Sequence, residues 1–389
     1  MRRHLHHLTH DERGMSLVFV SVAFMAMLSA TTLAIDVGMF MNARSQAQNA
    51  ADAGALAGAV ALAYNDFNDR TATGPAVRSA INTATSNRVA GGAVSVTPPD
   101  VTFPNDPAGQ PIRVQVQVFR TIARNNPVGT LMGGFFGVPT ADVAAVATAE
   151  ASPANAETCV MPFTIPDRWT ENQTGPWDPT DTFDAYDNHG NPIPNPDVYV
   201  PLRPYPDPNT NYTGYNADRD KGLEVVLKAS NSTNITASWY NPWDLPGSTG
   251  ASDYSNNISG CNPAIVGNGD TMTPEPGNMV GPTAQGMRDR IALDSNAHWD
   301  TGCNCVQGSS YRTSPRIVII PTYDPQVFAD GAQHGRNIDL QLVSFIGFFL
   351  EDMRGNDVVG RITPVGGISS ASRGPAPIGS FPKVIRLVQ

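Results

Sequence analysis

Residues 15–35, MSLVFVSVAFMAMLSATTLAI, form an uninterrupted run without a charged side chain. In an α-helix each residue advances about 1.5 Å, so this run reaches across the roughly 30 Å hydrocarbon core of a bilayer. It is also longer than the apolar part of a signal peptide, which usually has about 7–15 residues. We therefore expect a membrane-spanning helix at residues 15–41. A buried soluble helix and a cleaved signal peptide are the alternatives.

The sequence after this run continues to favour helix. Residues 36–63, DVGMFMNARSQAQNAADAGALAGAVALA, are rich in alanine and contain no proline. Alanine has the highest helix propensity, so the span should continue as one rod above the membrane. No A-x-A cleavage site closes the apolar run, which predicts that the anchor is retained.

The basic residues on either side of the span predict its orientation. Arg44 is the only one that follows it before Arg70, whereas three arginines precede it: Arg2, Arg3 and Arg13. Cytoplasmic flanks are enriched in Lys and Arg, so residues 1–14 should form a cytoplasmic tail. The pattern predicts a single-pass protein of the bacterial inner membrane, with its N-terminus cytoplasmic and the bulk of the chain periplasmic or extracellular.

Polar side chains flank the span on both sides. Asp36 lies at its outer end, where the carboxylate can reach interfacial water or pair with a partner helix. Imidazoles crowd the cytoplasmic tail at a density that can bind a divalent metal, although an unliganded tail is the simpler interpretation. These histidines are His4, His6, His7 and His10. We expect no metal site or cofactor in the tail.

A family resemblance lies in residues 12–59, ERGMSLVFVSVAFMAMLSATTLAIDVGMFMNARSQAQNAADAGALAGA. This stretch resembles the N-terminal region of TadG-like (TadE/G-like) Flp pilus-assembly proteins. It has Arg-Gly before the span, Ile-Asp-Val-Gly at its outer end and QNAADAGALA at residues 48–57. Residues 127–151, PVGTLMGGFFGVPTADVAAVATAEA, resemble the end of that family's first extracytoplasmic unit. The resemblance implies membrane anchorage, other pilus-assembly proteins as partners, and no enzymatic activity in this region.

Two departures from related patterns limit what the resemblance implies. Gly14 and Met15 look like a prepilin cleavage point, but Phe19 stands where a pilin has Glu. We therefore predict a vestigial processing point and retention of the residues before Met15. Some TadG-like proteins have a von Willebrand A domain with an Asp-x-Ser-x-Ser metal motif. The nearest string here, from Asp253 to Asn257, follows a turn-rich stretch rather than a strand, so we expect no such metal site.

The first exported unit should occupy residues 42–151 and combine helix with sheet. Residues 73–90 place Val77, Ile81 and Val89 at helical spacing. Apolar and polar residues then alternate in AVSVTP and in IRVQVQVF, the period of half-buried strands; in the second stretch one face has Ile112, Val114, Val116 and Val118. A helix on a small antiparallel sheet is pilin-like in outline. The polar residues 152–158, SPANAET, should form a linker.

Residues 159–389 should form a β-rich, loop-heavy second domain. Six apolar segments predict strands: residues 223–229, 234–240, 315–323, 340–350, 357–365 and 383–389. Residues 342–353 are too short and too acidic at their end for a second span, so we expect a buried strand there. The only predicted helix is 283–295, with Met287, Ile291 and Leu293 facing inward. The fold class is therefore α+β, dominated by sheet after the membrane helix.

All four cysteines, Cys159, Cys261, Cys303 and Cys305, lie in this second region. Export favours disulfides, and four cysteines allow three connectivities. A bond between Cys303 and Cys305 would close a strained small ring. This favours Cys261 paired with one of them and Cys159 with the other. A zinc site is the alternative, although the C-x-C spacing fits zinc poorly.

Two polar loops have carboxylates that could bind calcium, although Asx turns explain the same residues. They contain Asp178, Asp181, Asp184, Asp187 and Asn188, and Asn216, Asp218 and Asp220. An aromatic group in residues 238–254 could stack sugars or form part of the core. It contains Trp239, Tyr240, Trp243 and Tyr254.

The composition narrows the class of function. The formal net charge is −10 and there is no cluster of Lys and Arg, so we exclude a nucleic-acid partner. The chain lacks G-x-S-x-G, H-E-x-x-H and P-loop motifs. We therefore expect a non-catalytic structural or interaction component of Tad pilus assembly. A surface carbohydrate-binding adhesin and an exported hydrolase are the alternatives.

Overall fold

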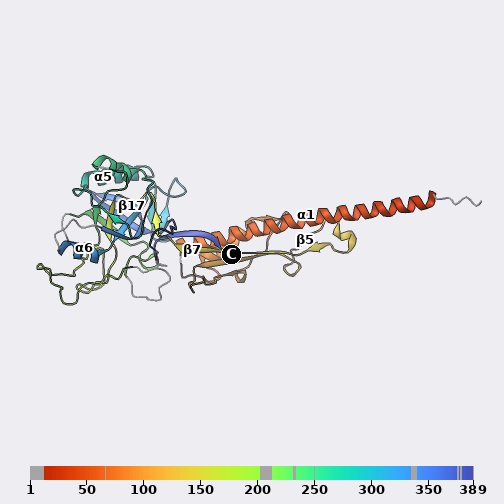
Figure 1. Ribbon diagram of the computed structural model, residues 1–389, viewed down its shortest axis with the longest axis horizontal. Helices are drawn as coiled ribbons and strands as arrows, with labels where there is room; N and C mark the ends of the chain where they lie inside the picture. Colours follow the sequence, from red (N-terminus) through yellow and green to blue (C-terminus); the bar gives the residue numbers. More distant parts are fainter. Residues whose placement is uncertain are drawn as a thin grey trace, which may run out of the picture.

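The computed structural model describes residues 13–65, 67–201, 213–230, 234–248, 250–333, 340–374, 376 and 379–388. Within these residues the molecule is elongated, because one long helix, α1 (Arg13–Tyr64), projects from a globular body (Figure 1). At the α-helical rise its length is about 78 Å. The expected α+β class, a long N-terminal helix followed by a β-rich region, is confirmed.

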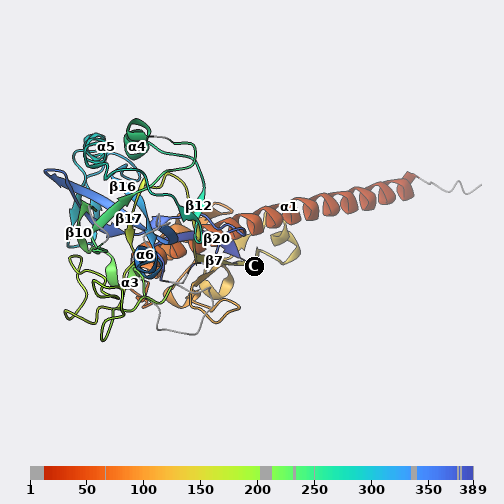
Figure 2. The ribbon, with the colours of Figure 1, turned by 60° about the vertical axis from the view of Figure 1, so that its left-hand side comes forward.

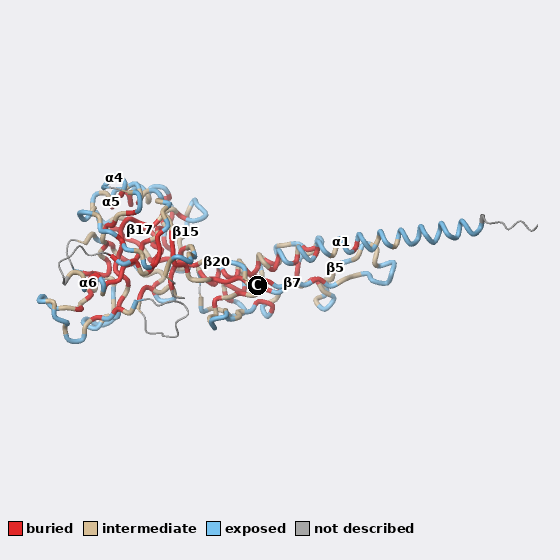
Figure 3. Tube along the Cα trace, viewed as in Figure 1, coloured by how far each residue is buried: buried red, intermediate tan, exposed pale blue. Residues whose placement is uncertain are grey.

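Helix α1 changes character at Asp36. Before this residue nearly every side chain is exposed, whereas beyond it one face of the helix is buried (Figure 3). The buried positions recur every three or four residues, which is the period of a helix face. They include Ala43, Ala47, Ala50, Ala51, Ala55, Ala59 and Leu62.

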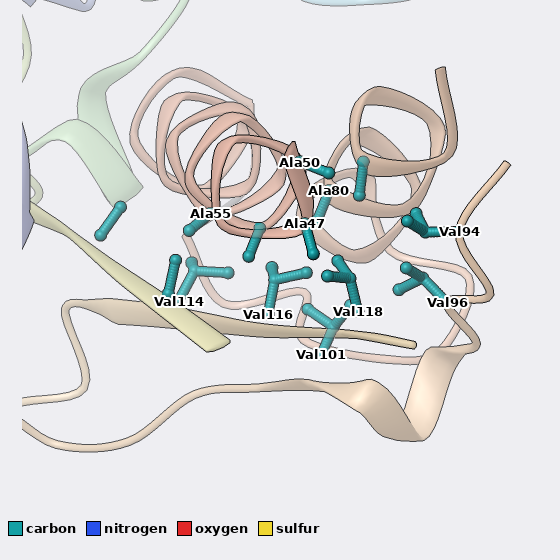
Figure 4. Packing of buried hydrophobic residues seen from close by; sticks show 14 of the residues in the cluster. Ala47, Ala50, Ala55, Ala80, Val94, Val96, Val101, Val114, Val116 and Val118 are labelled. Atoms are coloured by element: carbon teal, nitrogen blue, oxygen red, sulfur yellow. The ribbon is translucent and has the colours of Figure 1, made fainter. Parts of the chain in front are cut away.

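This alanine face packs on a second helix, α2 (Pro75–Ser86), and on strand β4 (Arg113–Arg120). Figure 4 shows Val114, Val116 and Val118 directed from β4 towards the alanines. The alternating face of the strand is confirmed. The helix predicted at 73–90 is confirmed over Pro75–Ser86, but it ends before Val89, which lies in β1 (Arg88–Val89). Of the residues AVSVTP, only Ala93 lies in a strand, although Ser95 bridges to Phe119.

Two glycines allow α1 to approach these neighbours closely. A Cβ atom at Gly54 would lie 2.9 Å from the Cβ of Ala84, and one at Gly58 would lie 2.8 Å from a methyl of Val114. Carbon atoms in ordinary contact are about 3.5–4.0 Å apart. The sequence QNAADAGALAGA therefore supplies a helix face small enough to touch both α2 and β4.

The first unit contains a five-stranded sheet in the order β19-β20-β7-β4-β3. Its other strands are β3 (Val101–Thr102), β7 (Val143–Pro153), β19 (Val365–Gly366) and β20 (Pro382–Val388). Strand β20 runs antiparallel to β7, from Lys383 opposite Pro153 to Val388 opposite Thr148. Figure 2 shows the two strands together beside α1. The expected division at 151 and 159 therefore needs correction, because the C-terminal strand of the second region belongs to the first sheet.

The expected polar linker at 152–158 is also wrong. Strand β7 continues to Pro153, and β8 (Ala156–Glu157) pairs with β12 (Val266–Gly267). Ala154, Ala156 and Glu157 are buried. The chain thus passes between the two units in paired strands rather than in a flexible linker. The polar side chains of this segment take part in contacts within the protein.

The second unit is built around a ring of six strands. The sheet order is β13-β17-β16-β9-β11-β10-β18, and β17 also pairs with β18, which closes the ring. The six ring strands are β9 (Phe163–Pro166), β10 (Glu224–Ala229), β11 (Trp239–Pro242), β16 (Ile317–Tyr323), β17 (Leu340–Arg354) and β18 (Asp357–Thr363). Strand β13 (Thr271–Met272) pairs with β17 outside the ring. The ring is filled by side chains such as Phe163, Leu227 and Phe348, as in other small barrels. All six predicted strand segments overlap observed strands, and 342–353 lies within β17.

The helices of the second unit differ from expectation. The predicted helix at 283–295 is α5 (Val280–Ala292), but Leu293 is 52 % exposed and does not face inward. Three further helices occur in the described residues: α3 (Ala217–Asp220), α4 (Gly250–Ser259) and α6 (Pro325–Gln333). Helix α4 has only two buried side chains, Tyr254 and Ile258, so its apolar periodicity is too short to be recognised.

The remaining short elements connect these layers. They are β1 (Arg88–Val89), β2 (Gly92–Ala93), η1 (Pro98–Asp100), η2 (Ile122–Arg124), β5 (Val128–Gly129), η3 (Gly133–Phe136), β6 (Thr140–Ala141), β14 (His298–Asp300) and β15 (Cys305–Gln307).

Candidate membrane-anchoring site

The exposed half of α1 is an apolar cylinder. Among the described residues, α1 is the one helix that is long and apolar enough to cross a membrane. Its large side chains point outward on all sides, and Leu17 and Phe19 are 69 % and 70 % exposed. Such a surface is unfavourable in water and favourable in hydrocarbon. This supports single-pass membrane anchoring by α1.

At the end of this cylinder Asp36 is held by backbone amides of a distant loop. The amide of Leu131 donates to its Oδ1 at 2.9 Å, and the amide of Gly133 donates to its Oδ2 at 2.6 Å. The amide of Met132 lies 3.3 Å and 3.2 Å from the two oxygens. Asp36 is only 6 % exposed. The carboxylate therefore caps the first turn of η3, where unpaired amides favour a negative charge.

This arrangement differs from both expectations for Asp36. The carboxylate neither faces interfacial water nor awaits a partner helix, because the chain's own residues 131–133 satisfy it. Sequence reasoning missed these partners, which lie 95 to 97 residues away. The sequence feature that could have predicted this contact is the glycine pair in TLMGGFFGV. A loop that directs several amides at one anion needs small residues.

The loop is a compact hairpin between β5 and β6. Strand β5 pairs with β6, the Thr130 hydroxyl donates to the carbonyl of Val138 at 2.8 Å, and the Val138 amide donates to the carbonyl of Gly133 at 2.9 Å. A Cβ atom at Gly133 would lie 2.6 Å from that Val138 carbonyl, so the turn requires glycine. Gly137 has φ +81°, which also favours glycine. Short-range bonds therefore give the hairpin a defined shape.

A second contact region joins the far end of α1 to the second unit. The Lys221 ammonium donates to the carbonyls of Tyr64 and Asn65, at 2.9 Å and 3.2 Å. These carbonyls lie at the C-terminus of α1, where a cation is favoured. The side chain of Asn304 in turn donates to the carbonyl of Lys221 at 3.1 Å.

Buried ionisable groups lie near this junction. Burial raises the pKa of the Glu157 carboxyl to about 8. Burial, with a smaller contribution from Glu157, raises the pKa of Tyr64 to about 12. Burial also lowers the pKa of Lys383 to about 8. These shifts follow from removing charged forms from water.

The four cysteines form two disulfides that differ from the favoured pairing. Cys159 is bonded to Cys261 and Cys303 to Cys305, with Cα atoms 4.4 Å and 5.2 Å apart. The predicted links from Cys261 to Cys303 or Cys305 are therefore wrong. The small ring is possible because Asn304 takes a left-handed conformation, φ +52°, and turns the chain between its neighbours.

Carboxylates of the candidate calcium loop form local turns. Asp178 accepts hydrogen bonds from Thr180, and Asp187 from His189 and Asn191, which are Asx turns. In the part of the chain that the structure describes, no group of three or more His, Cys, Asp or Glu is arranged to hold a metal ion. The tail histidines lie outside the described residues.

The aromatic group is part of the core rather than a sugar platform. Tyr240, Trp243 and Tyr254 are at most 3 % exposed, and Trp239 is half-buried. At the other end of the chain, Gly14 and Met15 lie in the first turn of α1, and Met15 is 61 % exposed. Retention of the residues before Met15 stays a prediction.

The comparison with known families matches the part of α1 that includes both the apolar cylinder and the alanine face. Residues 14–61 match the Tad family model, described as putative Flp pilus-assembly TadE/G-like. The resemblance to TadE/G-like proteins is confirmed for this segment. Neither the curated proteins nor the solved structures contain a match to the chain. We call the matched residues 14–61 the Tad segment. It ends close to Tyr64, where α1 contacts Lys221 of the second unit.

Proposed function

We propose that the chain is a membrane-anchored, non-catalytic component of a Tad (Flp) pilus-assembly system, whose exported units contact other assembly proteins. The observation that supports this most directly is the position of the Tad match. It spans both the candidate membrane helix and the alanine face that packs on α2 and β4. The matched segment thus joins a membrane anchor to a folded unit in one helix.

The proposal places the N-terminus in the cytoplasm and the sheet units outside the inner membrane. The arginines before the span support this orientation. Disulfide bonding of all four cysteines also supports an oxidising compartment. Burial of Tyr240, Trp243 and Tyr254 removes the main support for the alternative of a carbohydrate-binding adhesin.

Two measurements test the proposal. A reporter active only outside the cytoplasm should work when fused after Ala63, because α1 alone directs export. Activity solely of a cytoplasmic reporter at the same position would contradict the orientation. Chemical cross-linking in native membranes, followed by purification of the full chain and mass spectrometry, should recover pilus-assembly proteins. A matched preparation without the cross-linker should recover fewer of them.

A further inference from the structure

The hairpin held by Asp36 exposes large apolar side chains. We call Leu131, Phe135, Phe136 and Val138 the apolar tip; they are 61 %, 84 %, 62 % and 54 % exposed. No charged residue occurs between Arg124 and Asp142. Exposed apolar clusters of this kind usually contact a partner or a membrane, because leaving them in water is unfavourable.

The position of the tip identifies its partner. Residues 15–35 span about 31 Å as a helix, so Asp36 lies at the outer boundary of the hydrocarbon core. The amides of residues 131–133 bind Asp36, which fixes the base of the tip at that level. Figure 1 shows the β5 hairpin extending along α1 towards the N-terminal end, beyond the rest of the first sheet. The apolar tip is thus continuous with the apolar surface of the span.

Burial on α1 agrees with this placement. Ser29 and Thr32, which lie on the same helix face as Asp36, are half-buried, whereas the other described residues of the span are exposed. Element η3 contacts α1. The hairpin therefore covers one side of the helix at the level where the bilayer begins.

We infer that the apolar tip enters the outer leaflet of the membrane beside α1, with Phe135 and Phe136 among the lipid acyl chains. The inference rests on α1 crossing the membrane. Phenylalanine, leucine and valine side chains insert favourably into the hydrocarbon region of a bilayer. The buried Asp36 carboxylate is compatible with this level, because three amides compensate for its loss of water.

Insertion at two points has a mechanical consequence. A single helix can rotate about its axis and tilt within the bilayer. A second apolar contact beside the helix restricts both motions, so the exported units hold one orientation relative to the membrane.

The inference can be tested with the full chain in phospholipid vesicles. All four native cysteines are bonded, so Phe135→Cys supplies one site for an environment-sensitive fluorophore. We expect a blue-shifted emission that nitroxide groups on the lipid acyl chains quench. Tyr311→Cys is the matched control, since Tyr311 is 50 % exposed in the second unit and its label should remain in water.

Two outcomes would overturn the inference. Emission equal to that of the Tyr311 label would place the tip in water. A blue shift without quenching by the nitroxide lipids would assign the tip to a protein contact, such as a second copy. Phe136→Cys repeats the measurement if the first variant folds poorly. Alkaline extraction of the vesicles tests α1 separately. A chain that stays in the vesicles while its tip label remains in water contradicts insertion of the tip alone, whereas a chain that is extracted contradicts spanning by α1.

Discussion

The ammonium group of Lys221 lies 2.9 Å from the carbonyl oxygen of Tyr64, the last residue of α1. It also reaches the carbonyl of Asn65 at 3.2 Å. The final carbonyls of a helix have no partner within it and attract a positive charge. One side chain of the second unit therefore caps the C-terminus of α1.

Replacing this cation should weaken the junction. We expect Lys221→Met to reduce the free energy of unfolding by about 1–2 kcal/mol, through loss of charge-assisted hydrogen bonds. Thermal unfolding of the detergent-solubilised chain measures the effect. Lys228→Met is the control, because Lys228 is exposed and lies 4.0 Å from Asp357, a surface ion pair of small value. Equal effects of the two variants would show that the helix end does not depend on Lys221.

The two disulfides should differ in their contribution to stability. Cys159 and Cys261 are separated by 102 residues, whereas Cys303 and Cys305 are separated by two. A longer closed loop restricts the unfolded chain more, so the double replacement of Cys159 and Cys261 by Ser should cost about 2–4 kcal/mol and more than the matched replacement of the other pair. Non-reducing peptide mapping should recover the same two pairs. A peptide linking Cys261 to Cys303 would contradict the observed connectivity.

Two glycines of α1 form a matched pair for testing its close packing. At Gly58 a new Cβ meets a Val114 methyl at 2.8 Å, whereas at Gly38 nothing lies within 4 Å. Alanine gains about 1 kcal/mol over glycine in a helix, so Gly38→Ala should be neutral or stabilising. Gly58→Ala should lose this gain and destabilise the fold, since overpacking costs about 1–3 kcal/mol. The melting temperatures of the two variants measure the difference. A Gly58→Ala variant that is more stable than the native chain would contradict close packing at Gly58.

Burial of Glu157 predicts a pH effect on stability. Its pKa is raised from an ordinary value of 4.5 to about 8, so between these values the folded chain holds a proton that the unfolded chain releases. The contribution of this group to stability is therefore fully present below about pH 4.5 and is lost as pH rises towards 8. Glu157→Gln should melt higher than the native chain at pH 8 and differ less at pH 5. Parallel melting curves against pH would rule out the buried, protonated acid.

Sequence patterns among neighbouring residues predicted much of the fold. The alternation of valines in β4 is a direct consequence of a strand with one buried face, and the observed burial of Val114, Val116 and Val118 follows it. Strand β17 was recognisable from its apolar length, and the helix α1 from alanine content. Each of these features depends on neighbours within a few residues.

The missed features depend on contacts distant in sequence. Nothing in residues 383–389 indicates that β20 pairs with β7 rather than with its own domain, since any sheet edge would accept the same apolar strand. The partners of Asp36 are backbone amides, which every residue possesses. The Cys303–Cys305 ring depended on one left-handed residue, Asn304, a conformation that the spacing C-x-C does not reveal.

The return of β20 to β7 determines how a pulling force would travel through the molecule. The second unit leaves the first sheet at Pro153 and returns to it through β19 and β20, so tension on it acts on the adjacent strands β7 and β20 together. Strand β7 is bonded to β4 along eight residue pairs, from Val143 opposite Arg120 to Glu150 opposite Arg113. Tension along the strands loads these hydrogen bonds in shear, and β7 and β20 carry it together. In the proposed membrane-anchored arrangement, this connectivity transmits load from the second unit to the bilayer.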